Sequence, residues 1–509
     1  MGSHRLLDYL KQHFGYSSFR EGQQEIIEDV LEGKDVLGIL PTGVGKSLCF
    51  QLPSLLQKGT TIVVSPLISL MVDQVKQLKA KGFKSVVALN SFMELKERKA
   101  VFQSLHNYRL IYLSPEMLQN RTIIHELKKL YVELFVIDEA HCISQWGHEF
   151  RTDYLKLSQV VKEFGDPTIL ALSATATPEV QEDIKCQLKK LDMVSHIYRM
   201  DKSNMSFAVE DVLWHQEKVE RIKSIVSNKP APTMIYFSSR KAAEQVAAEL
   251  TLSLDQRIAF YHGGMETMDR LLVQQQFMKD ELDVICCTSA FGMGVNKPNI
   301  RRVIHYHFPT QIESFIQEIG RAGRDGKPCA SLVLHTPNDQ VLPQRLLEKE
   351  LPQEEDVERL LRWLAHKNEL LIDEEMTEIL QLAESQWNFL KYHLEYHHVV
   401  SNRMIQRHPD LIGLRAKISK RLKERWLYKN NKYKQMVNWI HCSGCRRKQL
   451  YAPFQNEISR PIVTCCDYCG FSIDDLEIYE ERVSSVDTIE NWQDRLRALF
   501  LQETTNDET

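Results

Sequence analysis

Between about residues 20 and 330, short runs of valine, isoleucine and leucine alternate with longer segments in which apolar residues recur at helical spacing. The runs are continuous rather than alternating, which predicts strands buried on both faces, as in a parallel sheet covered by helices on each side. We expect these strands at residues 35–40, 61–66, 109–115, 134–139, 168–175, 233–239, 283–289 and 301–309. The pattern predicts a doubly wound α/β architecture.

The apolar runs fall into two series that are separated by a polar stretch around residues 200–232, and they stop after about residue 336. A chain of 509 residues is too long for one hydrophobic core, so we expect several domains. The cleft between the two α/β domains is the expected ligand site. The predicted units are two α/β domains at 1–200 and 201–340, a helical segment at 341–410, a helical hairpin with a cysteine-rich module at 411–472, and an acidic tail at 473–509.

The composition, 43% hydrophobic and 26% charged, is that of a globular protein. The N-terminal segment lacks the apolar core of a signal peptide, and the sequence has no stretch approaching ~18 uninterrupted apolar residues, so we expect a cytoplasmic protein without a membrane partner. The net charge is −4, yet residues 415–448 contain twelve lysines and arginines and one glutamate. Such a cluster is typical of a nucleic-acid-binding surface, and equally of a solvated charged helix.

A phosphate-binding loop is predicted at residues 40–47, LPTGVGKS, directly after the first strand and before a helix-like segment. Thr42, Gly43 and Gly45 would bring backbone N–H groups around phosphate oxygens, Lys46 would reach the β- and γ-phosphates, and Ser47 would ligate Mg²⁺. The first position is leucine where the strict pattern has glycine.

The strand at 134–139 ends in two carboxylates, of which Asp138 would hold Mg²⁺ and Glu139 would position the attacking water. In the second domain, Arg321 and Arg324 are spaced as on one helix face and would stabilise charge that develops on the γ-phosphate. Together these groups predict nucleotide hydrolysis that depends on the relative position of the two domains.

The chain resembles the RecQ family of superfamily 2 DNA helicases in eight segments taken in order, FGYSSFREGQQEII, PTGVGKSLCFQLP, SPLISLMVDQV, DEAHCISQWGHEFRTDY, LSATAT, YHGGM, SAFGMGVNKPNIR and QEIGRAGRDG. The resemblance covers residues 4–335 and resumes at 433–470. It implies two tandem RecA-like motor domains, ATP and Mg²⁺ as cofactors, and 3′ to 5′ movement on single-stranded DNA that unwinds duplexes in recombination and repair. The implied partners are single-stranded and tailed duplex DNA, a single-stranded-DNA-binding protein and recombination proteins, at the nucleoid of a bacterial cytoplasm.

The resemblance also implies roles for single residues around the nucleotide. Gln23 would read the adenine edge, with Tyr16 and Arg20 framing the base, because a side-chain amide can form two hydrogen bonds with adenine. Gln317 would contact the nucleotide from the second domain.

In proteins similar to this one, an aromatic-rich loop follows the paired carboxylates and contacts single-stranded DNA. Flat side chains stack on bases of any identity, and each stack is worth ~1–3 kcal/mol. His141 would connect this loop to the hydrolytic residues, and Ser173 and Thr175 would link the nucleotide state to domain closure. The residues implied to contact DNA here are Gln145, Trp146, Phe150 and Arg151.

Five of the eleven cysteines lie between residues 442 and 469. The spacing C-x2-C-x20-C-x2-C predicts tetrahedral Zn²⁺ held by Cys442, Cys445, Cys466 and Cys469, with Cys465 and His441 as competing ligands. Arg446 and Arg447, next to the second cysteine, would contact DNA phosphates.

The chain departs from the family at its C-terminal end, where only about forty residues follow Cys469 and leave no room for the winged helix found there in RecQ proteins. About fifty additional residues precede the cysteines instead, and residues 376–400 form two helix-like segments that break near Glu384. Either a helix-turn-helix or relocated winged helix, or a plain helical hairpin, would fit them. His393, His397 and His398 are expected on a solvated helix face. The layout is similar to that of a short bacterial paralogue of RecQ.

Three other functions share these motifs. The first is a DNA-stimulated translocase or remodeller that does not separate strands, the second is a nucleic-acid-binding scaffold without ATP turnover, and the third is an RNA helicase. Intact phosphate-loop, carboxylate and arginine residues disfavour the scaffold.

Overall fold

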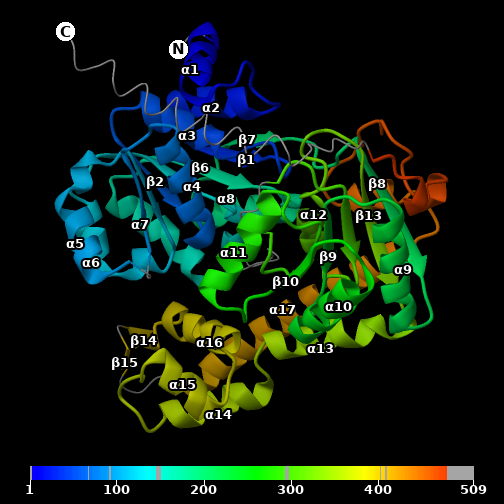
Figure 1. The fold of residues 1–509 in the computed structure, drawn as a ribbon. Coiled ribbons are helices and arrows are strands. Elements are labelled where there is room, and N and C mark those ends of the chain that lie inside the picture. The colour runs from blue at the N-terminus through cyan, green and yellow to red at the C-terminus, as the bar shows by residue number, and fades with distance from the viewer. Residues whose placement is uncertain are drawn as a thin grey trace, which may run out of the picture.

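The structure is a computed structural model and describes residues 3–66, 68–90, 93–144, 151–292, 297–401, 403–406 and 410–478. Two parallel sheets covered by helices lie side by side, and a helical unit lies below both of them in the view of Figure 1. The predicted fold class, with two tandem α/β domains, is confirmed.

The first sheet has seven parallel strands in the order β3-β4-β2-β5-β6-β1-β7. Neighbouring strand residues face opposite sides, because Leu37 and Ile39 pack into one core cluster and Val36 packs into another. The strands are β1 Val36–Ile39, β2 Thr60–Val64, β3 Val86–Leu89, β4 Leu110–Leu113, β5 Val132–Ile137, β6 Thr168–Ser173 and β7 Val194–Ile197. The accompanying helices are α1 Ser3–Phe14, α2 Gln23–Leu31, α3 Leu48–Leu56, α4 Ile68–Ala80, α5 Leu95–Gln103, α6 Arg121–Leu127, α7 Leu157–Glu163 and α8 Pro178–Leu188.

The second sheet has six parallel strands in the order β10-β11-β9-β12-β13-β8. Its strands are β8 Met205–Asp211, β9 Thr233–Tyr236, β10 Ile258–Tyr261, β11 Val284–Cys287, β12 Arg302–His305 and β13 Cys329–His335, and its helices are α9 His215–Asn228, α10 Arg240–Ser253, α11 Thr267–Met278 and α12 Ile312–Ile319. Each of the eight runs predicted as strands overlaps one, although β2 and β5 begin one and two residues before the predicted runs. The strands of the two sheets missed by the pattern are β3, β7, β8, β10 and β13.

A helical unit with its own core follows, around the fully buried Trp387, whose indole N–H donates to Asp373 Oδ1 at 2.8 Å. Its elements are α13 Val341–Glu350, α14 Glu354–Leu364, α15 Asp373–Leu380, α16 Glu384–Tyr396, and the antiparallel pair β14 Val400–Ser401 and β15 Met404–Ile405. Glu369, between α14 and α15, bridges to Met404 beside the β14–β15 pair. The segment is thus a unit of helices with a short antiparallel pair, and the choice between a relocated winged helix and a plain helical hairpin stays a prediction.

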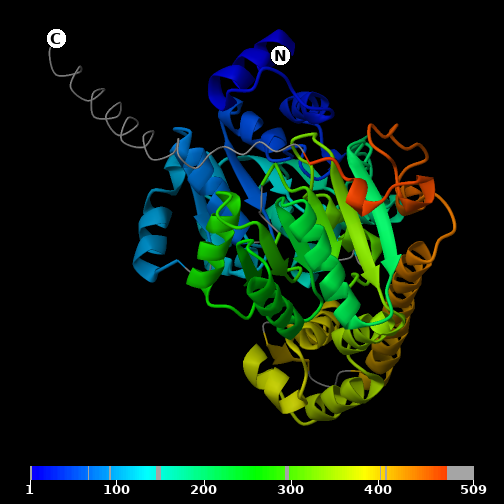
Figure 2. The ribbon, with the colours of Figure 1, turned by 45° about the vertical axis from the view of Figure 1, so that its right-hand side comes forward.

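The 30-residue helix α17, Leu411–Ile440, runs from this helical unit to the cysteine-rich module, which lies against β8 (Figure 2). The module contains α18, Arg446–Tyr451, and short turns around Cys466 and Ile473. The acidic tail predicted at 473–509 lies outside the described residues from residue 479 onward. None of the helices in the described part of the chain combines the length and the apolar character that crossing a bilayer requires.

Candidate active site and nucleic-acid interface

A cavity of about 460 Å³ opens where the two α/β domains meet. Residues from α2, the phosphate loop and the end of β5 line one side, and residues that follow α12 line the other. The structure therefore brings together side chains that lie about 300 positions apart in the sequence. The predicted residues that line this cavity are Tyr16, Arg20, Gln23, Thr42, Gly43, Gly45, Lys46, Ser47, Asp138, Glu139, Gln317, Arg321 and Arg324.

The phosphate loop connects the end of β1 to the start of α3, whose N-cap is Ser47. Gly43 and Gly45 have φ values of 89° and 87°, which place the backbone in the left-handed region that side chains with a Cβ disfavour. A Cβ on Gly43 would lie 3.0 Å from Cγ of Arg324, so the glycine also lets the second domain approach. Backbone N–H groups at the start of a helix suit an anion such as a nucleotide phosphate.

The residues expected around adenine are tied to this loop. Gln23 is buried, and its amide nitrogen donates to the carbonyl oxygens of Val44 at 2.8 Å and Gly45 at 3.1 Å. Its Oε1 accepts a hydrogen bond from the backbone N–H of Arg20 at 2.9 Å, and the guanidinium of Arg20 donates to the Gly43 carbonyl. The conformation of the phosphate loop therefore depends on the side chain that would read the base.

Asp138 is the half-buried carboxylate directly after β5. Its partial burial, and then the neighbouring charge of Glu139, raise the pKa of Asp138 to about 6, whereas Lys46 acts in the opposite direction. Ser65 Oγ donates to it at 3.4 Å. A half-buried carboxylate in one cavity with a second acid and Ser47 is an oxygen donor set that fits Mg²⁺, because a divalent cation would offset both negative charges.

Glu139 has a left-handed backbone, with φ 48° and ψ 50°, and this turn directs its carboxylate toward the phosphate loop. Its Oε1 lies 3.6 Å from Lys46 Nζ, and its Oε2 lies 3.4 Å from His141 Nδ1. The Glu139 carboxylate thus lies between the ammonium group of Lys46, on the side of the phosphate loop, and the imidazole of His141.

The residues expected to couple the domains form a continuous chain of contacts. The fully buried His141 has its Nδ1 2.9 Å from Ser173 Oγ, which also accepts the backbone N–H of Thr175 at 3.3 Å. The amide of Gln317, on α12 of the second domain, donates to Thr175 Oγ1 at 3.4 Å. The chain of contacts runs from Glu139 across the domain boundary.

Arg321 and Arg324 lie in the turn after α12, which ends at Ile319, so the prediction that they share a helix face is wrong. The turn approaches the phosphate loop, since Thr42 Oγ1 donates to the Gly320 carbonyl at 3.1 Å. Burial, and then the nearby Arg321, lower the pKa of Arg324 to about 10. A buried arginine and a half-buried one beside a phosphate loop favour an anionic ligand.

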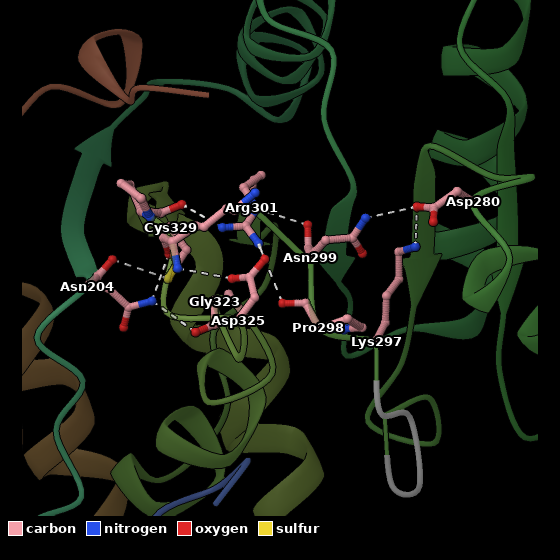
Figure 3. Close-up of polar contacts among 12 residues, drawn as sticks. Asn204, Asp280, Lys297, Pro298, Asn299, Arg301, Gly323, Asp325 and Cys329 are labelled. Atoms are coloured by element: carbon pink, nitrogen blue, oxygen red, sulfur yellow. Dashed lines mark hydrogen bonds and ion pairs between the residues drawn. The ribbon is translucent and has the colours of Figure 1, made fainter. Parts of the chain in front are cut away.

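The sequence did not indicate the residues that hold this turn. Lys202 Nζ donates to the carbonyls of Gly320 at 2.6 Å and Ala322 at 2.9 Å, one on each side of Arg321. Asn204 Nδ2 donates to the carbonyls of Gly323 at 2.9 Å and Lys327 at 2.7 Å (Figure 3).

On the other side of the turn, Arg301 forms an ion pair with Asp325 and donates to the Pro328 carbonyl at 3.0 Å (Figure 3). Arg301 belongs to the family-like segment SAFGMGVNKPNIR, which was the one sequence signal for this support.

The loop expected to contact DNA is described only at its two ends, because Gln145, Trp146 and Phe150 lie outside the described residues. The N–H of Arg151 donates to the Cys142 carbonyl at 3.0 Å, which fixes the two ends of the loop together. The guanidinium of Arg151 donates to the Pro66 carbonyl at 3.2 Å. Just after the loop, the buried Tyr154 donates its hydroxyl to the Asp138 carbonyl at 3.2 Å, so the loop is anchored directly on the carboxylate residue.

The cysteine cluster differs from the predicted ligand set. Four sulfur atoms, those of Cys445, Cys465, Cys466 and Cys469, lie within 4.8 Å of one another, and Cys442 is outside the group. The thiol of Cys442 faces the Gly444 carbonyl at 3.7 Å and the guanidinium of Arg446 at 3.6 Å instead. Cys465, the competing ligand, takes its place, and four thiolates fit a tetrahedral Zn²⁺.

The prediction that Arg447 contacts DNA is wrong, because its side chain is fully buried. It donates to Asp201 Oδ2 at 3.3 Å and to the Lys202 carbonyl at 2.6 Å. Arg446 is also enclosed, with bonds to Asp467 at 2.8 Å and to the Ile440 carbonyl at 2.7 Å. Both arginines fasten the module, Arg447 to the segment before β8 and Arg446 internally.

Comparisons with known proteins agree with these observations. The DEAD/DEAH box helicase model matches residues 20–184, and the helicase conserved C-terminal domain model matches residues 217–326. The chain is 41% identical over 510 residues to the probable ATP-dependent DNA helicase RecS of Bacillus subtilis, covering 99% of each chain. It is 42% identical to the ATP-dependent DNA helicase RecQ of Haemophilus influenzae over 351 residues, which are 68% of this chain and 56% of that protein.

Among solved structures, the helicase MrfA bound to DNA and AMPPNP has a TM-score of 0.57 at 20% identity, over 68% of this chain and 53% of that one. Mss116 bound to single-stranded RNA and UDP-BeF has a TM-score of 0.56 at 18% identity, over 82% of this chain and 95% of that one. At these identities the likeness shows the fold alone.

Proposed function

The chain belongs to the RecQ family and is an ATP-dependent DNA helicase, and on that premise we propose that it moves 3′ to 5′ along single-stranded DNA and unwinds tailed duplexes in recombination and repair. The observation that best supports this is the junction of the two α/β domains at one cavity. Two hydrogen bonds cross this junction, one from Thr42 to the Gly320 carbonyl and one from Gln317 to Thr175. A site completed only when two domains meet can convert nucleotide turnover into relative domain movement.

In the proposed reaction, the phosphate loop and Lys46 hold the triphosphate, and Ser47 and Asp138 would hold Mg²⁺, which would supply positive charge to offset that of the phosphates. Glu139 orients a water molecule toward the γ-phosphorus and accepts its proton as the new P–O bond forms and ADP leaves. Arg321 and Arg324 stabilise the charge that develops on the transferred group. The burial of Arg321 and the partial burial of Arg324 strengthen that interaction.

Coupling to DNA is proposed to pass through the aromatic-rich loop. Its two ends are fixed to each other and, through Tyr154, to the backbone of Asp138. Single-stranded DNA stacked on Trp146 and Phe150 would therefore bias the position of Asp138 and Glu139. The contacts from Glu139 through His141 and Ser173 carry the same bias toward the second domain.

The proposal is tested by ATP turnover with and without single-stranded DNA, together with unwinding of duplexes that carry a 3′ tail, a 5′ tail or no tail. We expect strong stimulation by DNA and unwinding of the 3′-tailed duplex. Trp146→Ala should abolish the stimulation, whereas the control Trp214→Ala should keep it, because Trp214 is an exposed tryptophan on the second domain. DNA-stimulated turnover without strand separation would identify a translocase instead, and preferential unwinding of the 5′-tailed duplex would refute the direction.

A further inference from the structure

A second cavity, of about 270 Å³, lies between the C-terminal half of α16 and the first half of α17. The motor mechanism does not use it. The α16 side presents Tyr392, His393, Tyr396 and His397, and the α17 side presents Lys417, Lys420 and Arg421 with Glu424. We call this cavity the α16–α17 groove.

The α16 side of the groove is aromatic. Residues four apart on a helix lie above one another, and the rings of Tyr392 and Tyr396 accordingly have centroids 5.5 Å apart, while those of His393 and His397 stack at 6.0 Å. The side chain of Tyr396 is displayed to solvent, being 59% exposed. The expectation of three solvated histidines is wrong for His393, which is buried, and burial lowers its pKa to about 4.

The α17 side of the groove is basic, and its charges are only partly compensated. Three cations face one acid, Glu424, which lies 3.0 Å from Arg421 and 4.0 Å from Lys420. The side chain of Lys420 is 78% exposed.

Three other basic residues of α17 are paired with acids of other elements. Arg415 pairs with Glu358, Lys429 with Glu350 and Lys432 with Glu313. The basic run recognised in the sequence therefore includes both cations that hold α17 in place and a set that is gathered at the groove.

The groove is continuous with the segment expected to carry DNA. Lys156, in the turn that follows the aromatic-rich loop, pairs with Glu395 on α16 at 2.6 Å. The turn that leads out of that loop therefore lies against α16.

We propose that the α16–α17 groove is an additional binding site for single-stranded DNA, in which a base stacks on Tyr396 and phosphates contact Lys417, Lys420 and Arg421. The site rests on the proposed function, since it extends the path of the same strand. Exposed aromatic rings beside cations are the chemistry by which proteins hold single strands without reading sequence.

The test measures binding of the full chain to short and long fluorescent oligodeoxythymidylates by anisotropy at several salt concentrations. Lys417→Ala with Lys420→Ala should weaken binding of the long strand several-fold and reduce the slope of log Kd against log salt by about 1.4, because each contacted phosphate contributes roughly 0.7 for single strands. Tyr396→Ala should weaken binding about tenfold, whereas Tyr396→Phe should restore it, because the ring remains.

Lys423→Ala is the matched control, because Lys423 is exposed on the same helix and does not line the groove. Thermal unfolding of every variant checks that α16 and α17 remain packed. Unchanged affinity and salt slope for the long strand would overturn the proposal, as would an equal loss for blunt duplex. If Trp146→Ala abolishes stimulation while the groove variants bind normally, the proposed function stands and the additional site does not.

Discussion

Gly320→Ala is the substitution that most directly tests whether hydrolysis needs the two domains in contact. Gly320 has φ −59° and ψ −7°, a conformation that alanine adopts without strain. The added Cβ would lie 3.0 Å from Thr42 Cβ and well inside contact distance of Thr42 Oγ1. The closest contacts are therefore across the domain boundary, and within its own domain the Cβ would also lie 2.9 Å from the Ile316 carbonyl oxygen, which is why the effect must be read against the Thr42 background.

The size of the effect depends on how far the turn that carries Arg321 and Arg324, which we call the arginine turn, must move away from the phosphate loop. Rotation of Thr42 can move its Oγ1, but this breaks the 3.1 Å hydrogen bond to Gly320 and leaves the Cβ atoms crowded. We expect the two loops to separate by about 1 Å, and a misplacement of about 1 Å at a reacting centre costs ~10²-fold in rate. That loss corresponds to about 2.7 kcal/mol of transition-state stabilisation.

The assay is steady-state ATP turnover at saturating single-stranded DNA. We expect kcat to fall about 100-fold while KM for ATP changes little, because the phosphate loop itself is intact. Thr42→Ala removes the closest atom, so Gly320→Ala should cost less in that background, and a double-mutant cycle measures the difference. Turnover within about twofold of the parent, or the same loss with Thr42→Ala, would refute the reasoning.

Three further predictions concern other parts of the site. Burial raises the pKa of Asp138 to about 6, so protons compete with Mg²⁺ for this carboxylate below that pH. The Mg²⁺ concentration for half-maximal turnover should therefore rise as pH falls through about 6. The same Mg²⁺ requirement on both sides of that pH would contradict this prediction. Lys202→Met should lower kcat about tenfold with little change in KM, because the carbonyls on both sides of Arg321 lose their hydrogen-bond donor. Burial lowers the pKa of Lys202 to about 8, so turnover of the wild-type protein should decline as pH rises through about 8. Cys465→Ser should reduce bound zinc and the unfolding temperature, whereas Cys442→Ser should change neither; equal zinc loss in both variants would restore the ligand set inferred from spacing.

The fold of the motor domains was predictable because their strands are continuous apolar runs, which period and composition identify. Among the strands missed, β7, VSHI, alternates between half-buried and exposed positions at a sheet edge, so it lacks a continuous apolar run. β3, VVAL, and β10, IAFY, are apolar but only four residues long, and so short an apolar run cannot be told from a buried helical segment by its period. The phosphate loop and the paired carboxylates were equally predictable from the sequence, because their chemistry depends on residues that are adjacent in the chain.

Spacing alone could not choose between the neighbouring cysteines. Cys465 and Cys466 are consecutive, and the regular C-x2-C pattern favours Cys442 as the partner of Cys445. The choice depends on a turn that directs the Cys442 thiol toward Arg446 instead. A distance of three residues permits either orientation, so the ligand set is a property of the packed module.

The two arginines beside the cysteines show how burial reverses a reasonable expectation. A pair of arginines on a rigid metal-binding turn suits DNA phosphates only if the turn faces solvent. Here the turn faces the second α/β domain, and Arg447 pairs with the buried Asp201, whose neighbour Lys202 holds the carbonyls on both sides of Arg321. An unpaired buried arginine would be costly, so Arg447 and Asp201 require each other. The cysteine module thereby supports the segment that positions the arginine turn, and its positive charge serves the ATP cavity rather than the nucleic acid.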